Sequence, residues 1–385
     1  MNMFILSELR PKKIRIELNQ ALAQQNITKK ARDNAVVVAG DTLAAIQKDE
    51  SLEKEFIDLC ESANVVLACR VSPKQKAEVV KMIRVRNPKK STLAIGDGAN
   101  DVNMITAAHI GIGISGLEGQ QAARAADYSI GQFRFLKNLL FCHGREAYRR
   151  NTYLISYMFY KNVLYVTPIW MYGFMSFFSG TIIYDTYLYQ CYNIFFTGMP
   201  IIYFAVFDWE YPKEYFLKRP KLYMIGLEDV FFNPTVFWRW FFYAVWQGTL
   251  LLFLSFYTLD YSSNTQGSFG SLSTDGQFVF GCVVVVVNIK VLISSYQYTF
   301  WAVLFVILSV MAFYVAFAVL SMLKNYSLTG DFAQLYGFPE TYFSLLFFMF
   351  AYVLVDSGLQ LANAEVRRWM MVRKEMESVA ELKSI

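Results

Sequence analysis

Residues 96–102 read GDGANDV and follow directly on a short apolar run at residues 92–95. The two glycines permit a tight turn from a buried strand into a helix. Asp97 then leaves the tip of the strand and Asp101 enters the helix, so both carboxylates can face one cleft. Mg²⁺ is often held by one or two carboxylates with phosphate oxygens and water, and Asn100 offers an amide to a phosphate. We predict a magnesium–phosphate site with Asp97 and Asp101 as metal ligands. The alternative is a turn whose polar residues only cap the helix.

Short apolar runs alternate with helical patterns through the first part of the chain. This alternation is typical of a parallel α/β sheet, and such sheets bind ligands at the carboxyl ends of their strands. The predicted strands lie at residues 36–39, 65–70, 92–95, 110–114 and 128–130. The predicted helices lie at residues 52–63, 73–86, 100–107 and 119–126. The GDGANDV stretch is therefore expected at the ligand-binding edge of the sheet.

A basic stretch, CRVSPKQKA at residues 69–77, lies upstream of this turn. Ser72 is a good N-cap and Pro73 a good first residue of a helix. Lys76 then lies in the first helical turn, where its ammonium could screen charge on a transferring phosphoryl group. Arg70, at the tip of its strand, could reach a nucleotide phosphate. The alternatives are a solvated helix start for Lys76 and a surface salt bridge for Arg70.

Hydrophobic residues make up 55% of the 385-residue chain, and the mean hydropathy is +0.30. The apolar excess begins near residue 150, beyond which long stretches carry no charge. A membrane-spanning helix needs about 20 mostly apolar residues. Six stretches fit, at residues 152–178, 187–207, 236–258, 277–295, 299–322 and 341–361. We predict a cytosolic α/β lobe at residues 1–150, an all-α bundle of about six helices at 151–362 and a cytosolic tail at 363–385.

Basic residues orient the predicted spans, because loops rich in Lys and Arg stay in the cytosol. They gather in the loop at 208–235 and in the tail, at Lys213, Lys218, Arg219, Lys221, Arg367, Arg368, Arg373 and Lys374. The loops at 179–186 and 259–276 have none. We predict a multi-pass membrane protein with both termini in the cytosol. The net charge of +5 comes without a basic stripe interleaved with aromatics, so nucleic acid is not predicted as a partner.

Lys161 lies well inside the first predicted span, where a charged side chain costs about 3 kcal/mol. The lysine either snorkels back to the membrane interface or faces the bundle interior beside a polar pathway. Asn193 and Thr197 are four residues apart and are expected to share one face of the second span. Together with Asn162 they could line an interior polar seam. The alternative is ordinary hydrogen bonding between helices.

Three stretches stand out together: residues 69–77, residues 96–102 and GISGLEGQQAARAADYSI at 113–130. Together they resemble the phosphorylation domain of a P-type ATPase. The resemblance continues through residues 132–151, FYKN at 159–162, and Tyr192, Asn193, Phe196, Thr197 and Pro200. The combination is similar to the type IV branch, the phospholipid flippases, and it covers nearly the whole chain. The implied fold is a haloacid-dehalogenase-like α/β lobe, a partial phosphorylation domain, joined to the last six of ten transmembrane helices.

The resemblance also implies roles for individual residues. Mg²⁺ is expected at Asp97 and Asp101, and ATP or its phosphoryl group at Arg70, Lys76, Asn100 and Asp101. Lys161, Asn162 and Asn193 are expected beside the path of the phospholipid. The family moves lipid between leaflets with an aspartyl-phosphate intermediate, mostly with a small accessory membrane subunit. A plasma, Golgi or endosomal membrane is the expected location.

The main departure from the family pattern is the nucleophile. The family carries it in an Asp-Lys-Thr-Gly-Thr motif, and this sequence contains none. Covalent catalysis needs its nucleophile, so we expect this chain alone neither to hydrolyse ATP nor to move lipid. A carboxyl-terminal part of a flippase and a non-catalytic scaffold or decoy that binds the accessory subunit are both consistent with this absence. Retention of Asp97, Asn100, Asp101 and Lys76 favours the first.

Two further alternatives are weaker. Asp41 follows the apolar run at 36–39, as the nucleophile of a membrane-tethered phosphatase would, but the second aspartate of that motif is missing. A cation pump would place several carboxylates inside these spans. Here the first two spans have no internal carboxylate, and Asp356 alone lies within the sixth.

Overall fold

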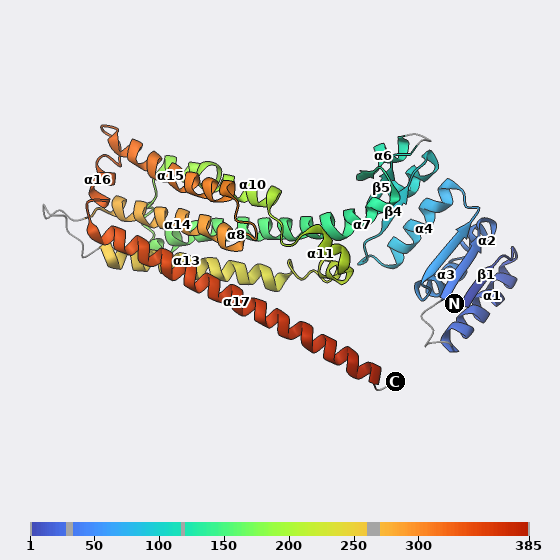
Figure 1. Cartoon of the computed structure of the whole chain (residues 1–385). Coiled ribbons are helices and arrows are strands. Elements are labelled where there is room, and N and C mark those ends of the chain that lie inside the picture. The colour runs from blue at the N-terminus through green and yellow to red at the C-terminus, as the bar shows by residue number, and fades with distance from the viewer. Residues whose placement is uncertain (1, 28–33, 117–119, 260–269, 384–385) are drawn as a thin grey trace. The chain divides into compact units, whose positions relative to one another are not determined.

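A computed structural model describes residues 2–27, 34–116, 120–259 and 270–383, and the chain divides into two compact units (Figure 1). The first unit is Met1–Asn138 and the second is Leu139–Ile385. The boundary predicted near residue 150 falls inside α8 (Arg145–Met175), a single continuous helix of the second unit.

The first unit contains two three-stranded parallel sheets where the sequence predicted one sheet. The first has the order β1 (Asn2–Leu6), β2 (Asn34–Ala39), β3 (Val65–Cys69). The second has the order β4 (Leu93–Gly96), β5 (Ile110–Ile114), β6 (Tyr128–Ile130). Val36 is the register partner of both Phe4 and Val66, and Ile112 of both Ile95 and Tyr128. Among the described residues β3 and β4 do not pair with each other, and this leaves the sheet in two halves.

The helices of this unit are α1 (Pro11–Ile27), α2 (Gly40–Ile46), α3 (Glu50–Glu61), α4 (Pro73–Arg86), α5 (Val102–Ala107) and α6 (Gln121–Ala125). The prediction of Ser72 as an N-cap is confirmed, because its Oγ accepts the Gln75 N–H at 3.3 Å. The Gln75 side chain accepts the Ser72 N–H in return at 2.8 Å, which completes a capping box. β1, α1 and α2 were not predicted. They build the core of the first sheet, in which Ile14 and Leu18 of α1 are fully buried.

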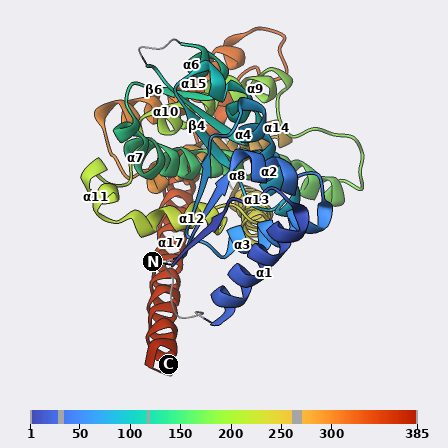
Figure 2. The ribbon, with the colours of Figure 1, turned by 90° about the vertical axis from the view of Figure 1, so that its right-hand side faces the viewer.

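The second unit is a helical bundle. Its long helices are α8 (Arg145–Met175), α13 (Pro234–Leu259), α14 (Leu272–Ser294), α15 (Phe300–Met322) and α17 (Pro339–Lys383). A further span runs through α9 (Thr186–Cys191), a π-helical turn (Tyr192–Phe196) and α10 (Gly198–Phe207). Short helices lie between them: α11 (Lys213–Lys218), α12 (Met224–Leu227) and α16 (Asp331–Leu335). α7 (Leu136–Asn138) is the last helix of the first unit. The described part of the predicted tail, residues 363–383, belongs to α17, which extends beyond the other helices of this unit (Figures 1 and 2).

Within the described residues, five helical segments, not six, are long and apolar enough to cross a membrane. They are Thr186–Phe207, Pro234–Leu259, Leu272–Ser294, Phe300–Met322 and Pro339–Ala362. The first predicted span, residues 152–178, does not qualify. It forms α8, a 31-residue helix whose tyrosines, Lys161 and Asn162 make it too polar. α8 packs inside the bundle, where α13, α14 and α10 contact it.

α14 is the centre of the bundle. In its most apolar stretch 83% of the residues are buried, compared with 22% in α15 and 17% in α17. Consecutive buried valines make this helix apolar on every side, as expected for a helix surrounded by other helices. Gly276, near its start, is a point of close approach: a Cβ there would lie 1.9 Å from the carbonyl oxygen of Ile183. Only glycine fits against that backbone.

We predict that Gly276→Ala destabilises the bundle, because the backbone at Ile183 must move to admit a methyl group. The expected loss is about 1–3 kcal/mol, the usual cost of overpacking, seen as a lower melting temperature of the purified chain in detergent. Gly358→Ala in α17 is the matched control, since nothing lies within 4 Å of the added methyl. Equal melting temperatures for the two variants would contradict the prediction.

Candidate functional site

The first unit carries an open pocket of about 510 Å³ at the carboxyl ends of strands from both sheets. Ala68 of β3, Ile95 and Gly96 of β4 and Ile114 of β5 line one side. The rest of the lining comes from Val71, Lys76, Val79, Val80, Asp97, Asp101, Met104 and Phe133. The pocket is therefore at the edge where parallel α/β sheets bind ligands, as the sequence predicted.

Lys76 and Asp101 form the charged centre of this pocket. The Nζ of Lys76 donates to the Oδ1 of Asp101 at 2.8 Å, and the two side chains are 33% and 12% exposed. The capped start of α4 positions the lysine. Gly96 positions the aspartate, because a Cβ at residue 96 would lie 2.3 Å from the Cβ of Asp101. The aspartate thus packs over the glycine at the strand tip.

Asp97 lines the same pocket and is exposed. No group of three or more His, Cys, Asp or Glu side chains among the described residues could enclose a metal ion. Mg²⁺ does not need such a cage, because it keeps several waters and binds through one or two carboxylates plus phosphate oxygens. Asp97 and Asp101 are two hard oxygen donors at the rim of one open pocket. They fit Mg²⁺ held jointly with a phosphate.

Arg70 and Asn100 do not line the pocket, and both are exposed. Arg70 has a backbone φ of 55°, which is uncommon for a residue other than glycine. Its carbonyl packs against Gly40, where a Cβ would lie 2.4 Å from the oxygen. The structure therefore brings Lys76, Asp97 and Asp101 together and leaves Arg70 and Asn100 at the margin.

The apolar wall of the pocket was not predicted. Met104 and Phe133 belong to it, and the Phe133 ring is 62% exposed. An exposed ring can stack on a planar ligand such as a nucleotide base. The available signal was an aromatic residue directly after a predicted strand, in a segment without a periodic pattern.

A second polar site, separate from this pocket, surrounds Lys161 inside the bundle. It is 1% exposed, so it faces the interior and does not snorkel. Its Nζ donates to the Oγ1 of Thr197 at 2.9 Å and lies 5.8 Å from the Tyr192 ring centroid. The Tyr192 hydroxyl donates to the Lys161 carbonyl at 2.9 Å. The interior alternative for this lysine is the one observed.

The predicted seam of Asn162, Asn193 and Thr197 is wrong as a set. Thr197 is fully buried, but Asn162 and Asn193 are exposed on the bundle surface. The cause is the π-helical turn Tyr192–Phe196, in which residues five apart share a face. Tyr192 and Thr197 accordingly point inward together, and the Thr197 hydroxyl donates to the Tyr192 carbonyl at 2.7 Å.

Asn288 of α14 is an interior polar residue that we did not predict. It is fully buried, and its Nδ2 donates to the carbonyls of Phe196 and Val284 at 2.8 Å each. It therefore holds the end of the π-helical turn against the central helix. A single asparagine in a run of valines was the sequence signal.

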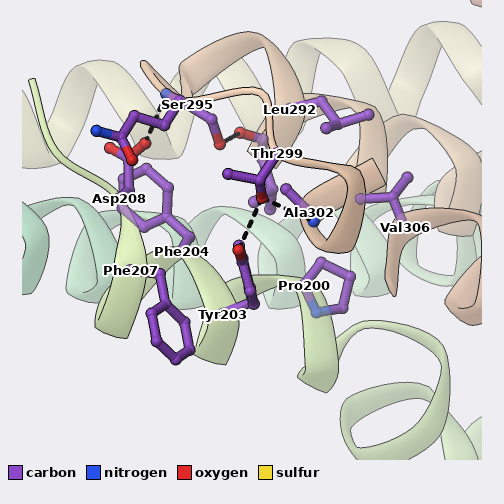
Figure 3. Close-up of a pocket in the computed structure, with 12 residues that line it drawn as sticks. Pro200, Tyr203, Phe204, Phe207, Asp208, Leu292, Ser295, Thr299, Ala302 and Val306 are labelled. Atoms are coloured by element: carbon purple, nitrogen blue, oxygen red, sulfur yellow. Dashed lines mark hydrogen bonds between the residues drawn. The ribbon is translucent and has the colours of Figure 1, made fainter. Parts of the chain in front are cut away.

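A small hollow lies beside α10 and the loop between α14 and α15 (Figure 3). Its volume is about 10 Å³, room for about one water molecule. The hydroxyls of Tyr203 and Thr299 bond across it at 2.7 Å. Asp208 accepts the Gln297 N–H at 3.1 Å and a hydrogen bond from Arg149 at 2.8 Å. This region is a packed junction and too small for a ligand.

The sequence matches two family models. Residues 123–368 match a family described as phospholipid-translocating P-type ATPase C-terminal. Residues 9–129 match a family described as haloacid dehalogenase-like hydrolase.

Several curated proteins are similar over most of this chain. Phospholipid-transporting ATPase C887.12 of Schizosaccharomyces pombe is 37% identical over 341 residues, covering 86% of this chain and 27% of that protein. Phospholipid-transporting ATPase DRS2 of Saccharomyces cerevisiae is 41% identical over 272 residues, 69% of this chain and 20% of that protein. Phospholipid-transporting ATPase IG of Homo sapiens is 31% identical over 371 residues, 92% of this chain and 33% of that protein. The matched region is thus a third or less of each of these relatives.

We predict that Gly96→Ala weakens divalent-cation binding to the pocket, because its methyl group displaces the Asp101 carboxylate. The expected loss is about tenfold in affinity, the scale of disturbing a ligand's support, measured by titration with Mn²⁺ as a paramagnetic probe in place of Mg²⁺. Gly131→Ala is the matched control, since its Cβ would meet no atom closer than 4.0 Å. Unchanged Mn²⁺ affinity in Gly96→Ala would remove Asp101 from the metal site.

Proposed function

We propose a function for this chain, which belongs to the family of phospholipid-translocating P-type ATPases. In our proposal it is the part of an ATP-driven lipid flippase that holds Mg²⁺ with phosphate and carries the carboxyl-terminal spans. The Lys76–Asp101 pair carries the proposal. With Asp97 it places an ammonium and two carboxylates at the carboxyl ends of parallel strands, in one pocket. The names of the relatives add phospholipid as the transported substrate.

The charged and aromatic residues of the pocket each have one assigned task. Mg²⁺, when bound, neutralises charge on phosphate oxygens and orients them. Asp97, directly after β4, and Asp101, directly before α5, would hold the ion. Lys76 leaves Asp101 and donates to the phosphoryl oxygens, stabilising the charge that develops on them. Phe133 offers a ring face to the base of ATP. Arg70 and Asn100 reach the nucleotide only after their side chains move toward the pocket.

The nucleophilic aspartate comes, in this proposal, from a segment that the sequence given does not contain. The open strand edges support this assignment. Among the described residues β3 pairs only with β2, and β4 only with β5. Val65, Val66 and Leu67 of β3 are 40–52% exposed, although strands of parallel sheets are normally covered on both faces. A further strand beside these edges would cover them and end at the pocket.

The bundle supplies the lipid path. Lys161 is the buried cation of α8, and a cation at this depth is costly unless it has a use or a partner. Its hydrogen-bond partner is the neutral Thr197, so its charge is not cancelled by a carboxylate there. We assign it to the phosphate of a lipid head group. Asn162 and Asn193, exposed on the bundle surface, would then face spans that lie outside this sequence.

A chimera tests the ATP-dependent part of the proposal. This chain replaces the segment of the fission-yeast relative to which it aligns, and phosphoenzyme formation from labelled ATP is measured. The chimera is expected to form phosphoenzyme, and Lys76→Met to reduce its rate about 100-fold, a typical loss for one charge-stabilising donor. Lys81→Met, on the exposed side of the same helix, is the matched control. Full activity of Lys76→Met, or phosphoenzyme on this chain alone, would refute the assignment.

Lys161→Met in the same chimera tests the lipid path. The expected result is loss of lipid-stimulated ATP hydrolysis with unchanged Mg²⁺ dependence of phosphoenzyme formation, because the lysine is in the bundle and the metal ligands are in the first unit. Lys324→Met, an exposed lysine outside the spans, is the control. Normal lipid stimulation in Lys161→Met would remove this residue from the path.

A further inference from the structure

A second buried lysine lies in the bundle, distinct from Lys161. Lys290 of α14 and Asp356 of α17 are 6% and 1% exposed, and both lie in helices apolar enough to span a membrane. The Nζ of Lys290 donates to the Oδ1 of Asp356. The carboxylate also accepts from the Tyr243 hydroxyl and from the Gln360 amide, each at 3.2 Å. Within the described spans, this is a fully paired and hydrogen-bonded charge pair.

Aromatic rings enclose the same ammonium. Its Nζ lies 5.0 Å from the Tyr243 ring centroid, 5.1 Å from that of Trp240 and 5.7 Å from that of Tyr160. Cations are attracted to the negative faces of such rings. Tyr160 belongs to α8, and Trp240 and Tyr243 belong to α13. One ammonium therefore contacts groups from α8, α13 and α17 while it is carried by α14.

The Lys290–Asp356 pair matters most for the position of α17. This helix is the least buried of the five apolar segments, at 17%. Helices in lipid gain no hydrophobic energy from association, so packing and polar contacts decide where they lie. The interhelical hydrogen bonds of α17 around Asp356 and Gln360 reach α13 and α14. The other contacts of α17 with the core of the bundle include apolar packing, in which the rings of Phe348 and Phe278 lie 6.3 Å apart.

The rings of Tyr160, Trp240 and Tyr243 form a cage around Lys290, and this cage is connected to the proposed lipid path through α8. Tyr160 precedes Lys161 on α8, and its hydroxyl donates to the Oε1 of Gln247 on α13. Tyr160 thus faces Lys290 and α13, while Lys161 faces Thr197 on the other side of α8. Movement of the cage would move the turn of α8 that carries Lys161.

We propose that Lys290 and Asp356 are positioning residues: they clamp α17 to the bundle and, through Tyr160, set the place of Lys161. The effect on transport rests on the proposed function, whereas the clamp itself does not. Neutralising one partner leaves the other as an unpaired buried charge. Removing both charges leaves an apolar contact that still joins α14 to α17. Exchanging the two residues puts a carboxylate against the negative faces of three rings.

The clamp is tested on this chain in nanodiscs, without any need for activity. Ser294→Cys with Gln360→Cys forms a reporter pair for a short bismaleimide, because the native Oγ and Nε2 atoms are 3.5 Å apart across α14 and α17. Cross-linking of this pair by the bismaleimide should be efficient in the parent and strongly reduced with Lys290→Met or Asp356→Asn. The double variant Lys290→Met, Asp356→Leu should regain most of the cross-linking and the melting temperature. The exchange Lys290→Asp, Asp356→Lys should regain neither.

The reciprocal outcomes overturn the proposal. Parent-level cross-linking in both single variants would show that the pair does not hold α17, and recovery in the exchanged variant would show that the rings play no part. In the chimera, Lys290→Met should raise the lipid concentration for half-maximal ATP hydrolysis about tenfold and leave phosphoenzyme formation unchanged, with recovery in the neutral double variant. A loss of turnover that the double variant does not recover, with normal cross-linking, would make Lys290 a direct participant and refute a positioning role.

Discussion

The polarity of α8 is the constraint on which the bundle depends. This helix carries Arg149, Lys161 and several tyrosines, and a helix in lipid cannot leave such groups without partners. The protein supplies them: Arg149 pairs with Glu146 and Asp208, Lys161 bonds to Thr197, and the Tyr157 hydroxyl donates to the Val287 carbonyl at 3.3 Å. α8 therefore turns these groups toward neighbouring helices, while apolar residues such as Phe159 and Trp170 lie on its exposed side. The mostly apolar α14 packs against α8, and its own buried polar residues, Asn288 and Lys290, are hydrogen-bonded as well.

The π-helical turn Tyr192–Phe196 follows from the same constraint. An ordinary helix would direct Tyr192 and Thr197 to different faces, and Lys161 would then lose either its hydroxyl partner or the ring beside it. The wider turn brings both inward, and Asn288 stabilises it by donating to the carbonyl of Phe196, at the end of the turn. Local irregularity of the backbone here lowers the cost of a buried cation. π-helical turns often occur at functional sites, and this one lies beside the lysine that we place on the lipid path.

The sequence predicted the local elements better than their assembly. β5, β6 and α4 have the predicted bounds, because apolar runs and a Ser-Pro start are local signals. The division into two sheets was not predictable, since it depends on a strand edge that β3 and β4 leave open. Lys76 and Asp101 were both expected at the phosphoryl group, but their pairing with each other was not predicted. The exposure of Asn193 was missed because the i, i+4 rule assumes a regular helix, and the Lys290–Asp356 pair because side chains of distant spans meet only in the folded bundle.

The strength of the Lys76–Asp101 pair bears on how the pocket could work. Lys76 is 33% exposed, and exposed or half-exposed ion pairs stabilise a protein by only about 0–1 kcal/mol. A phosphate with bound Mg²⁺ offers the ammonium more negative charge than one carboxylate does. It also offers Asp101 a divalent ion in exchange. Both partners therefore gain when the pair opens, and the cost of opening it is small. By contrast, Lys290 is buried, bonded to a carboxylate and enclosed by rings, so it gains nothing by moving. In our proposals the same residue type thus serves as a mobile phosphate contact in the first unit and as a fixed joint inside the second.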